Sequence, residues 1–342
     1  MDLIACGRCR HMAALFALSA LAAAAEAVPK PPARGEEAGR VPETAVRPLA
    51  PAADDAMAKL LKPFELPAAA FDWQMKPLAT SSAVYAVTFP SPLVTAVESN
   101  NTVHCEYFVA QQGGKRPAVI VLHILDGKFI AERLVSGCLA ASGTHALLLK
   151  MPYYGPRRPP EWKGRMTDDV EMLSAGLQQA IVDVRRAALW LSTRPEVDPQ
   201  ALGLVGISLG GFVAASSAGV DGNFPRVMVV LAGGDLVKVL DNKSREVVAI
   251  REAAAKKGWD SAKLRELLKP VEPLTYASRL KNTKVLMISS KEDEVVPGEC
   301  AQALATASGA TVQWYDATHY TLVQALPTLL PMVAEYFAAG AK

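Results

Sequence analysis

The chain has 342 residues, of which 51% are hydrophobic and 20% are charged. This length and composition suit a large buried core in one big α/β domain or in two small ones. Lys and Arg total 36 against 34 Asp and Glu, and the resulting net charge of +2 supplies no broad positive field, which disfavours binding to nucleic acid or to an anionic membrane.

The N-terminus carries the pattern of a secretory signal. Arg8 and Arg10 precede an apolar run over residues 12–25, which ends in the small-x-small sequence Ala25-Glu26-Ala27. This run is shorter than the roughly 20 residues that a membrane-spanning helix needs, and no later segment is long and apolar enough to span a membrane. We therefore expect residues 1–27 to be a signal peptide cleaved after Ala27, the protein to be exported to the periplasm or secreted, and no stable membrane insertion.

Residues 28–55 are rich in Pro, Ala, Glu and Arg and show little apolar periodicity, so a disordered or extended leader is expected there. Residues 56–342 are expected to form one domain. Loss of the signal leaves Cys105, Cys138 and Cys300, whose spacing is not that of a metal site. Small buried thiols are the favoured interpretation, and one disulfide plus a free thiol is the alternative.

Short β-rich runs alternate with longer helical stretches along the domain. Strands are expected at residues 84–89, 103–110, 118–125, 146–151, 201–207, 227–231, 285–289 and 311–315, and helices at 128–141, 168–192, 210–218 and 320–339. The central runs, such as Val119-Ile120-Val121-Leu122, are almost continuously apolar, as strands covered on both faces require. The pattern predicts an α/β fold with a mostly parallel sheet of about eight strands, an antiparallel opening and helices on both faces.

A charged, mainly helical insertion is expected at residues 235–281, between the sixth and seventh of these strands. Its length suits a lid that covers part of a site. Alternatively, its charges form the solvated face of ordinary helices.

The strongest local signal is Gly206-Ile207-Ser208-Leu209-Gly210, which joins an apolar strand to a helix. A serine on so sharp a turn needs small neighbours, because a Cβ at either glycine would crowd the backbone. The hydroxyl is then exposed at the N-terminus of a helix, where negative charge is stabilised. A glycine-rich turn with an incidental serine is the alternative, and the flanking strand and helix argue against it.

From this motif to the C-terminus, and back to about residue 84, the chain resembles the α/β-hydrolase superfamily. In that family an acid and then a histidine follow the nucleophile Ser208. Asp293, in Asp293-Glu294-Val295-Val296-Pro297, matches the acid, with Asp235 in reserve. His319, directly ahead of the last helix, matches the histidine. The resemblance implies a catalytic triad of these three residues.

The family takes one oxyanion donor from the residue after the nucleophile, here Leu209, and one from the loop after the third strand. That loop reads His123-Ile124-Leu125-Asp126-Gly127, so the second donor is Ile124 or Leu125. The loop departs from the His-Gly-Gly-Gly form of many lipases. It resembles instead the loops of dienelactone-hydrolase-like and acetyl-esterase-like members.

Substrate contacts are expected at the carboxyl ends of the strands, which is the ligand side of such folds. The candidates are His123 and, in the loop at residues 151–159, Tyr153, Tyr154 and Arg157. The alternative for this loop is a rigid, Pro-rich surface segment with solvated arginines.

These features favour a serine esterase that forms an acyl-enzyme, needs no metal or cofactor and acts on small or polymer-attached esters. A peptidase related to prolyl oligopeptidase would use the same triad on an amide. Members of that family carry an N-terminal propeller domain, but only about 80 residues precede the expected first strand at residue 84, which disfavours the peptidase. A non-catalytic binding protein of the same fold is the third alternative.

Overall fold

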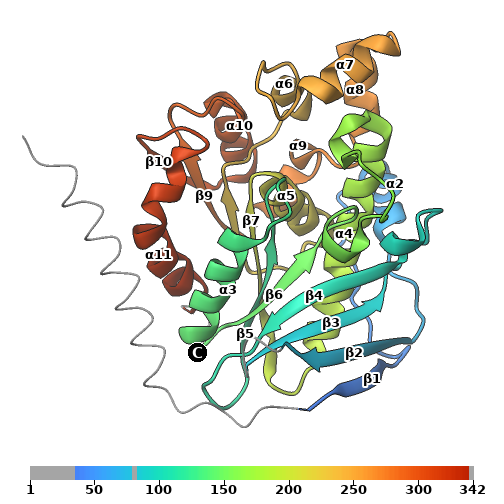
Figure 1. The fold of residues 1–342 in the computed structure, drawn as a ribbon, viewed down its shortest axis with the longest axis vertical. Coiled ribbons are helices and arrows are strands. Elements are labelled where there is room, and N and C mark those ends of the chain that lie inside the picture. The colour runs from blue at the N-terminus through green and yellow to red at the C-terminus, as the bar shows by residue number, and fades with distance from the viewer. Residues whose placement is uncertain (1–34, 79–82, 339–342) are drawn as a thin grey trace, which may run out of the picture.

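The computed structural model describes residues 35–78 and 83–338 (Figure 1). The expected signal peptide, residues 1–27, and the first part of the expected leader lie outside these ranges. Cleavage after Ala27 and export therefore stay predictions.

One sheet forms the centre of the molecule (Figure 1). Its strands are β1 (Glu37–Val41), β2 (Phe71–Pro77), β3 (Val84–Pro90), β4 (Thr102–Phe108), β5 (Arg116–Leu122), β6 (His145–Lys150), β7 (Val197–Ile207), β8 (Arg226–Val230), β9 (Lys284–Ser290) and β10 (Thr311–Tyr315). Their order is β1-β2-β3-β4-β6-β5-β7-β8-β9-β10. Pairing is antiparallel from β1 through β4 to β6, and parallel from β6 onward.

The fold class is confirmed, and all eight expected strands are present. The expected strand number is wrong, however, because the sheet has ten strands. The two additional strands, β1 and β2, extend its antiparallel edge.

Helices cover both faces of the sheet (Figure 1). The α-helices are α2 (Asp55–Leu61), α3 (Ile130–Ala141), α4 (Val170–Ser192), α5 (Leu209–Asp221), α6 (Leu236–Leu240), α7 (Val248–Lys256), α8 (Ser261–Leu268), α9 (Pro273–Tyr276), α10 (Gly298–Ser308) and α11 (Leu326–Ala338). The 3-10 helices are η1 (Lys62–Phe64), η2 (Glu98–Asn101), η3 (Gly155–Arg157), η4 (Met166–Asp168), η5 (Ala277–Leu280) and η6 (Thr321–Ala325). The single helix expected at 320–339 is thus η6 followed by α11.

Two apolar cores follow from the alternation of side chains along the buried strands. In β5, Ile120 and Leu122 face a core shared with α4, α5 and α10, whereas Val119 and Val121 face a second core shared with α3 and α11. Because both faces of this strand are buried, its sequence is apolar at successive positions.

The insertion at residues 235–281 is helical, as expected, and contains α6 to α9 and η5. It is attached to the body of the domain, since Lys257 forms ion pairs with Asp169 (2.8 Å) and Glu171 (2.7 Å) at the start of α4. That the insertion acts as a lid stays a prediction.

Of the two expected states of residues 28–55, disordered or extended, the described part is extended and ordered. There, β1 pairs with β2, and the extended segment that follows lies on the domain. The Arg47 side chain forms an ion pair with buried Asp221 (2.7 Å), and the Arg47 carbonyl accepts a hydrogen bond from Arg185 (2.6 Å). Because an extended segment makes few internal hydrogen bonds, a carbonyl such as that of Arg47 is free to accept from an arginine of the body.

Arg47→Ala should lower the free energy of unfolding by about 1.5–3 kcal/mol, because it removes charged hydrogen bonds to a carboxylate that is fully buried. Arg40→Ala, which breaks the exposed Arg40–Asp72 pair of the same leader, is the matched control and should cost less than about 1 kcal/mol. Urea unfolding of both variants measures the difference. Equal effects would contradict a docked role for this segment.

Candidate active site

Ser208 sits at the turn between β7 and α5 with φ 52° and ψ −116°. A positive φ is sterically unfavourable for a residue with a Cβ, so the surrounding structure has to hold it. One restraint is the Ser208 N–H, which donates to the Val230 carbonyl on β8 (2.8 Å). The strained turn places the serine side chain in the cavity at the carboxyl ends of the strands.

Two glycines make this turn sterically feasible, as the sequence motif predicts. A Cβ at Gly206 would lie 2.0 Å from the Gly210 carbonyl oxygen. A Cβ at Gly210 would lie 2.4 Å from the Leu122 carbonyl oxygen at the end of β5. Both distances are far inside van der Waals contact with backbone, so neither position tolerates a side chain without moving the turn.

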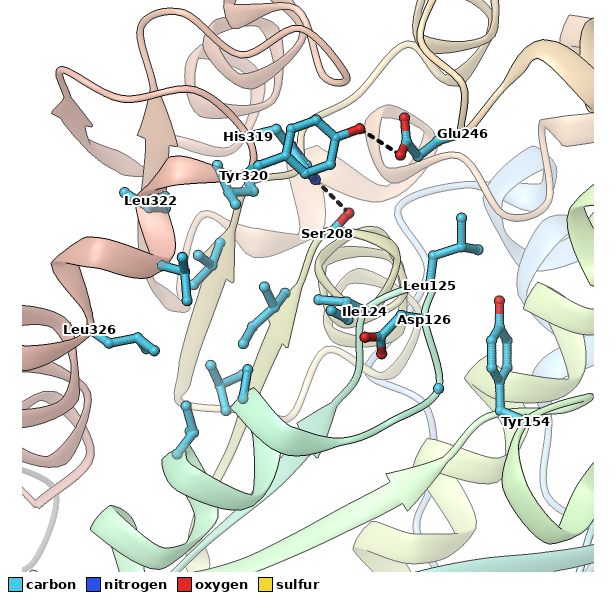
Figure 2. A pocket seen from close by; sticks show the side chains of 18 of the residues that line it. Ile124, Leu125, Asp126, Tyr154, Ser208, Glu246, His319, Tyr320, Leu322 and Leu326 are labelled. Atoms are coloured by element: carbon cyan, nitrogen blue, oxygen red, sulfur yellow. Dashed lines mark hydrogen bonds between the residues drawn. The ribbon is translucent and has the colours of Figure 1, made fainter.

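His319 follows β10 and lies next to Ser208 (Figure 2), with Asp293 on the other side of its ring. Its Nε2 is 3.0 Å from Ser208 Oγ, and its Nδ1 is 2.9 Å from each carboxylate oxygen of Asp293. Donation of Nδ1–H to Asp293 leaves Nε2 as an acceptor for the serine hydroxyl proton. The three residues picked from the sequence therefore form one continuous hydrogen-bonded line.

The loop after β9 fixes the Asp293 carboxylate from its other side. Asp293 Oδ1 accepts hydrogen bonds from the N–H groups of Val295 (2.9 Å) and Val296 (2.7 Å). Glu294 instead accepts from the His319 backbone N–H (2.9 Å), which holds the histidine loop in place. Glu294 thus positions the loop that carries His319, while Asp293 contacts the imidazole ring of His319.

The reserve acid, Asp235, is not part of this line. Its side chain caps α6 by accepting from the Lys238 N–H and forms an ion pair with Arg265 (2.8 Å). The choice between the two acids is therefore settled by position in favour of Asp293.

The two expected oxyanion donors from the β5 loop are not equivalent. The Ile124 N–H already donates to the Glu132 carboxylate on α3 (2.9 Å), so Ile124 was the wrong alternative. Leu125 is the remaining candidate, and both it and Ser208 line the cavity. Leu209 opens α5, where the first amides of a helix have no acceptor within the helix.

His123 is not a substrate contact, contrary to the expectation. Its side chain is fully buried, with Nδ1–H donating to the Ile124 carbonyl (2.7 Å) and Nε2 accepting from the Met151 N–H (3.0 Å). Burial lowers the pKa of His123 to about 4, so the ring is neutral and braces two loops of the site.

Arg157 is also misassigned as a substrate contact. It is fully buried, pairs with buried Asp183 (2.8 Å) and donates to the Asn100 carbonyl (2.6 Å). The sequence of this loop, which is rich in Pro and Arg, does not indicate that the Arg157 side chain is buried. Of the expected substrate residues, Tyr153 and Tyr154 do line the cavity.

The cavity next to Ser208 has a volume of about 960 Å³. Its polar lining includes Arg158 of the expected substrate loop and Arg245 of the expected insertion, together with Arg165, Glu246 and Tyr320, which sequence reasoning did not single out. Tyr320 directly follows His319, and its hydroxyl donates to Glu246 of the insertion (2.6 Å; Figure 2). The insertion therefore forms part of the cavity wall.

Within residues 35–78 and 83–338, no cluster of three or more His, Cys, Asp and Glu side chains is placed to hold a metal ion. Cys105, Cys138 and Cys300 are free thiols, so the disulfide alternative is wrong for this structure. No helix in the described part of the chain has both the length and the apolar character to cross a membrane.

The buried, neutral state of His123 predicts acid sensitivity. The pKa of His123 is lower in the folded chain than its ordinary value of about 6.5. The neutral ring therefore contributes fully to the free energy of unfolding above pH 6.5, and this contribution is lost as the pH falls toward 4. The loss from this residue should reach about 3 kcal/mol. His123→Gln, which cannot take up a proton, should show a smaller fall in unfolding free energy between pH 6.5 and 4 than the native chain. Parallel pH profiles of the two proteins would rule the interpretation out.

Comparisons with known proteins agree with the fold. The model of the family "alpha/beta hydrolase domain containing 18" matches residues 46–233, more than half of the chain. The model of the prolyl oligopeptidase family matches residues 177–321, a range that contains Ser208, Asp293 and His319. Two uncharacterized proteins of Mycobacterium tuberculosis are 28% identical over 100 residues, and the match covers 29% of this chain and 24% of theirs.

Solved structures of similar fold include the acetyl xylan esterase from Paenibacillus sp. R4, with 19% identity, a TM-score of 0.64 and coverage of 86% of this chain and 98% of that one. Acetyl xylan esterase 1 from Thermoanaerobacterium sp. JW/SL YS485 follows with 17% identity, a TM-score of 0.63 and coverage of 79% and 88%. A putative dienelactone hydrolase from Klebsiella pneumoniae has 17% identity, a TM-score of 0.52 and coverage of 75% and 99%. At these identities the likeness is one of fold. Together with the match over residues 46–233, it identifies the chain as a member of the alpha/beta hydrolase domain containing 18 family.

Proposed function

We propose that the chain is a serine hydrolase that cleaves carboxylic esters through an acyl-enzyme. The observation that carries this proposal is the line of hydrogen bonds from Ser208 through His319 to Asp293. Such a line supplies a nucleophile, a base and a group that orients the base. The acetyl xylan esterases of similar fold add support for an ester as substrate.

In the proposed reaction, Ser208 Oγ attacks the ester carbonyl while His319 Nε2 takes up the hydroxyl proton. Asp293 stabilises the imidazolium that forms. The amides of Leu209 and Leu125 donate to the negative oxygen of the tetrahedral intermediate. The carbon–oxygen bond to the alcohol then breaks, and the alcohol leaves with the proton from His319.

The second half of the reaction repeats these steps with water. His319 removes a proton from a water molecule as its oxygen attacks the acyl carbon, and the proton is returned to Ser208 Oγ when the acid leaves. The net change is one ester and one water converted into one acid and one alcohol.

A serine peptidase is the second candidate, because the prolyl oligopeptidase family model covers all three residues of the line. The same chemistry would act on an amide. A p-nitroanilide and a p-nitrophenyl ester with the same acyl group separate the two candidates: faster amide cleavage at equal enzyme concentration would favour the peptidase.

Ser208→Ala should abolish both hydrolysis of p-nitrophenyl esters and covalent labelling by a fluorophosphonate, while the native protein carries the label on Ser208.

Asp293→Asn should lower kcat by about 10³–10⁴-fold, because the histidine loses the partner that fixes its tautomer. Glu292→Gln changes the adjacent exposed acid and is the matched control, with kcat expected to stay within about twofold. A folded native protein with neither turnover nor label would contradict the catalytic proposal and leave a binding protein.

Glu132 offers a test of the oxyanion loop. Burial raises the pKa of this carboxyl, and its Oε1 holds the Ile124 amide next to Leu125. Glu132→Leu should lower kcat by about 10²-fold with little change in KM, since the loop would lose the contact that positions the donor amide. Glu132→Gln keeps an acceptor and should restore most of kcat. A purely structural role would instead lower the amount of folded protein without changing kcat.

A further inference from the structure

The cavity beside Ser208 has two chemically distinct parts. Its mouth carries charged side chains, among them Asp126, Arg158 and Arg165. A deeper part, called here the inner arm, is lined by Val135, Val205, Ile288, Leu329, Leu330 and Val333. All six of these side chains are apolar, so the polarity of the cavity changes from its mouth to its inner end.

The inner arm lies between the sheet and the pair of helices that covers one of its faces. Val205 and Ile288 come from β7 and β9, Val135 from α3, and Leu329 and Val333 from α11. Figure 2 shows Leu322 and Leu326 on this helical side and Ser208 hydrogen-bonded to His319. The arm therefore begins at the reacting oxygen and continues into the second core.

Two chain segments that border the arm indicate its length. Val205 lies three residues before Ser208, in β7, which ends at Ile207, and this places it roughly 10 Å back from the turn at the usual rise per residue. Along α11, the span from Leu326 to Val333 is also about 10 Å.

Protein interiors are close-packed, so space behind buried apolar side chains needs an explanation. Val135 and Val333 are 4% exposed, Leu329 6% and Leu330 8%, and all four border the cavity, whereas Val205 and Ile288 are at most 1% exposed and contact almost none of its open space. A space with such walls offers water few hydrogen-bond partners. An apolar ligand group fills it with a favourable free energy.

The order in which the two halves of an ester leave the site indicates whether the acyl half or the alcohol half occupies the inner arm. The acyl half stays bonded to Ser208 after the alcohol leaves, and the alcohol needs a route to solvent. The arm is the inner end of the cavity, whereas the mouth with Arg158 and Arg165 is its polar side. We infer that the inner arm binds the acyl chain, and that the substrates are esters of medium-chain or longer fatty acids with a polar alcohol. This inference rests on the proposed serine-ester hydrolysis.

The first test is the chain-length profile of the native protein on p-nitrophenyl acetate, butyrate, octanoate and dodecanoate. Each methylene buried in the arm should raise kcat/KM by about fourfold, so octanoate, with four more methylenes, should exceed butyrate by roughly 250-fold. A flat or falling profile, in a protein that a fluorophosphonate labels on Ser208, would overturn the acyl assignment and leave the serine-esterase proposal intact.

Two neighbouring residues of α3 provide a matched pair of variants. Val135 lines the arm and is 4% exposed, whereas Leu134 is 40% exposed and does not line it. Val135→Phe should lower the ratio of kcat/KM for octanoate to kcat/KM for acetate by at least about 30-fold, because only a long chain reaches the added ring. Leu134→Phe should leave this ratio within about twofold. An unchanged octanoate preference in folded Val135→Phe would contradict the proposal.

A binding measurement covers the case in which Val135→Phe folds poorly. Dodecanoate, titrated calorimetrically into the Ser208→Ala protein, should bind more tightly than butyrate by at least a hundredfold. Equal binding of the two acids would contradict an acyl-binding role of the inner arm.

Methyl octanoate and octyl acetate distinguish the orientation of the ester: faster hydrolysis of octyl acetate would place the alcohol in the arm and overturn the assignment. Absence of both ester turnover and Ser208 labelling would refute the proposed function and this inference with it.

Discussion

The close approach of Gly206 to Gly210 allows Ser208 to adopt a positive φ, and the rest of the site is arranged around that position. The strand before the turn, β7, is paired on both sides, to β5 and β8. Because this pairing fixes β7, the two glycines stay in close contact. The Val230 carbonyl of β8 then holds the Ser208 amide. A parallel sheet buried on both faces thus supplies the rigidity that a strained turn requires.

The same sheet brings distant parts of the chain to one edge. Loops after β5, β7, β9 and β10 contribute, respectively, Leu125, Ser208, Asp293 and His319, since parallel strands end on the same side. Between this edge and the helices α3 and α11 lies the inner arm of the cavity. The Ser208 hydroxyl, hydrogen-bonded to His319, thus lies in the same cavity as an apolar space, and this combination supports the proposed fatty-acyl ester as substrate.

Much of this was predictable from the sequence, for identifiable reasons. Continuous apolar runs marked the buried strands, and the elbow motif with the order Ser, acid, His gave the three aligned residues. β2 was missed although Phe71, Trp73 and Met75 alternate with polar residues, a period that is typical of a strand with one buried face. β1 has no such pattern and forms because β2 offers an open edge. His123 and Arg157 were misassigned because the sequence does not reveal that both side chains are buried and hydrogen-bonded to backbone.

The central claim is that Ser208 carries the acyl group during turnover. The most direct measurement is intact-protein mass spectrometry of the native chain, quenched in acid while it hydrolyses p-nitrophenyl butyrate, followed by peptide mapping. The account predicts an added mass equal to one butyryl group, located on Ser208. Turnover with no adduct, or with an adduct on another residue, would contradict it.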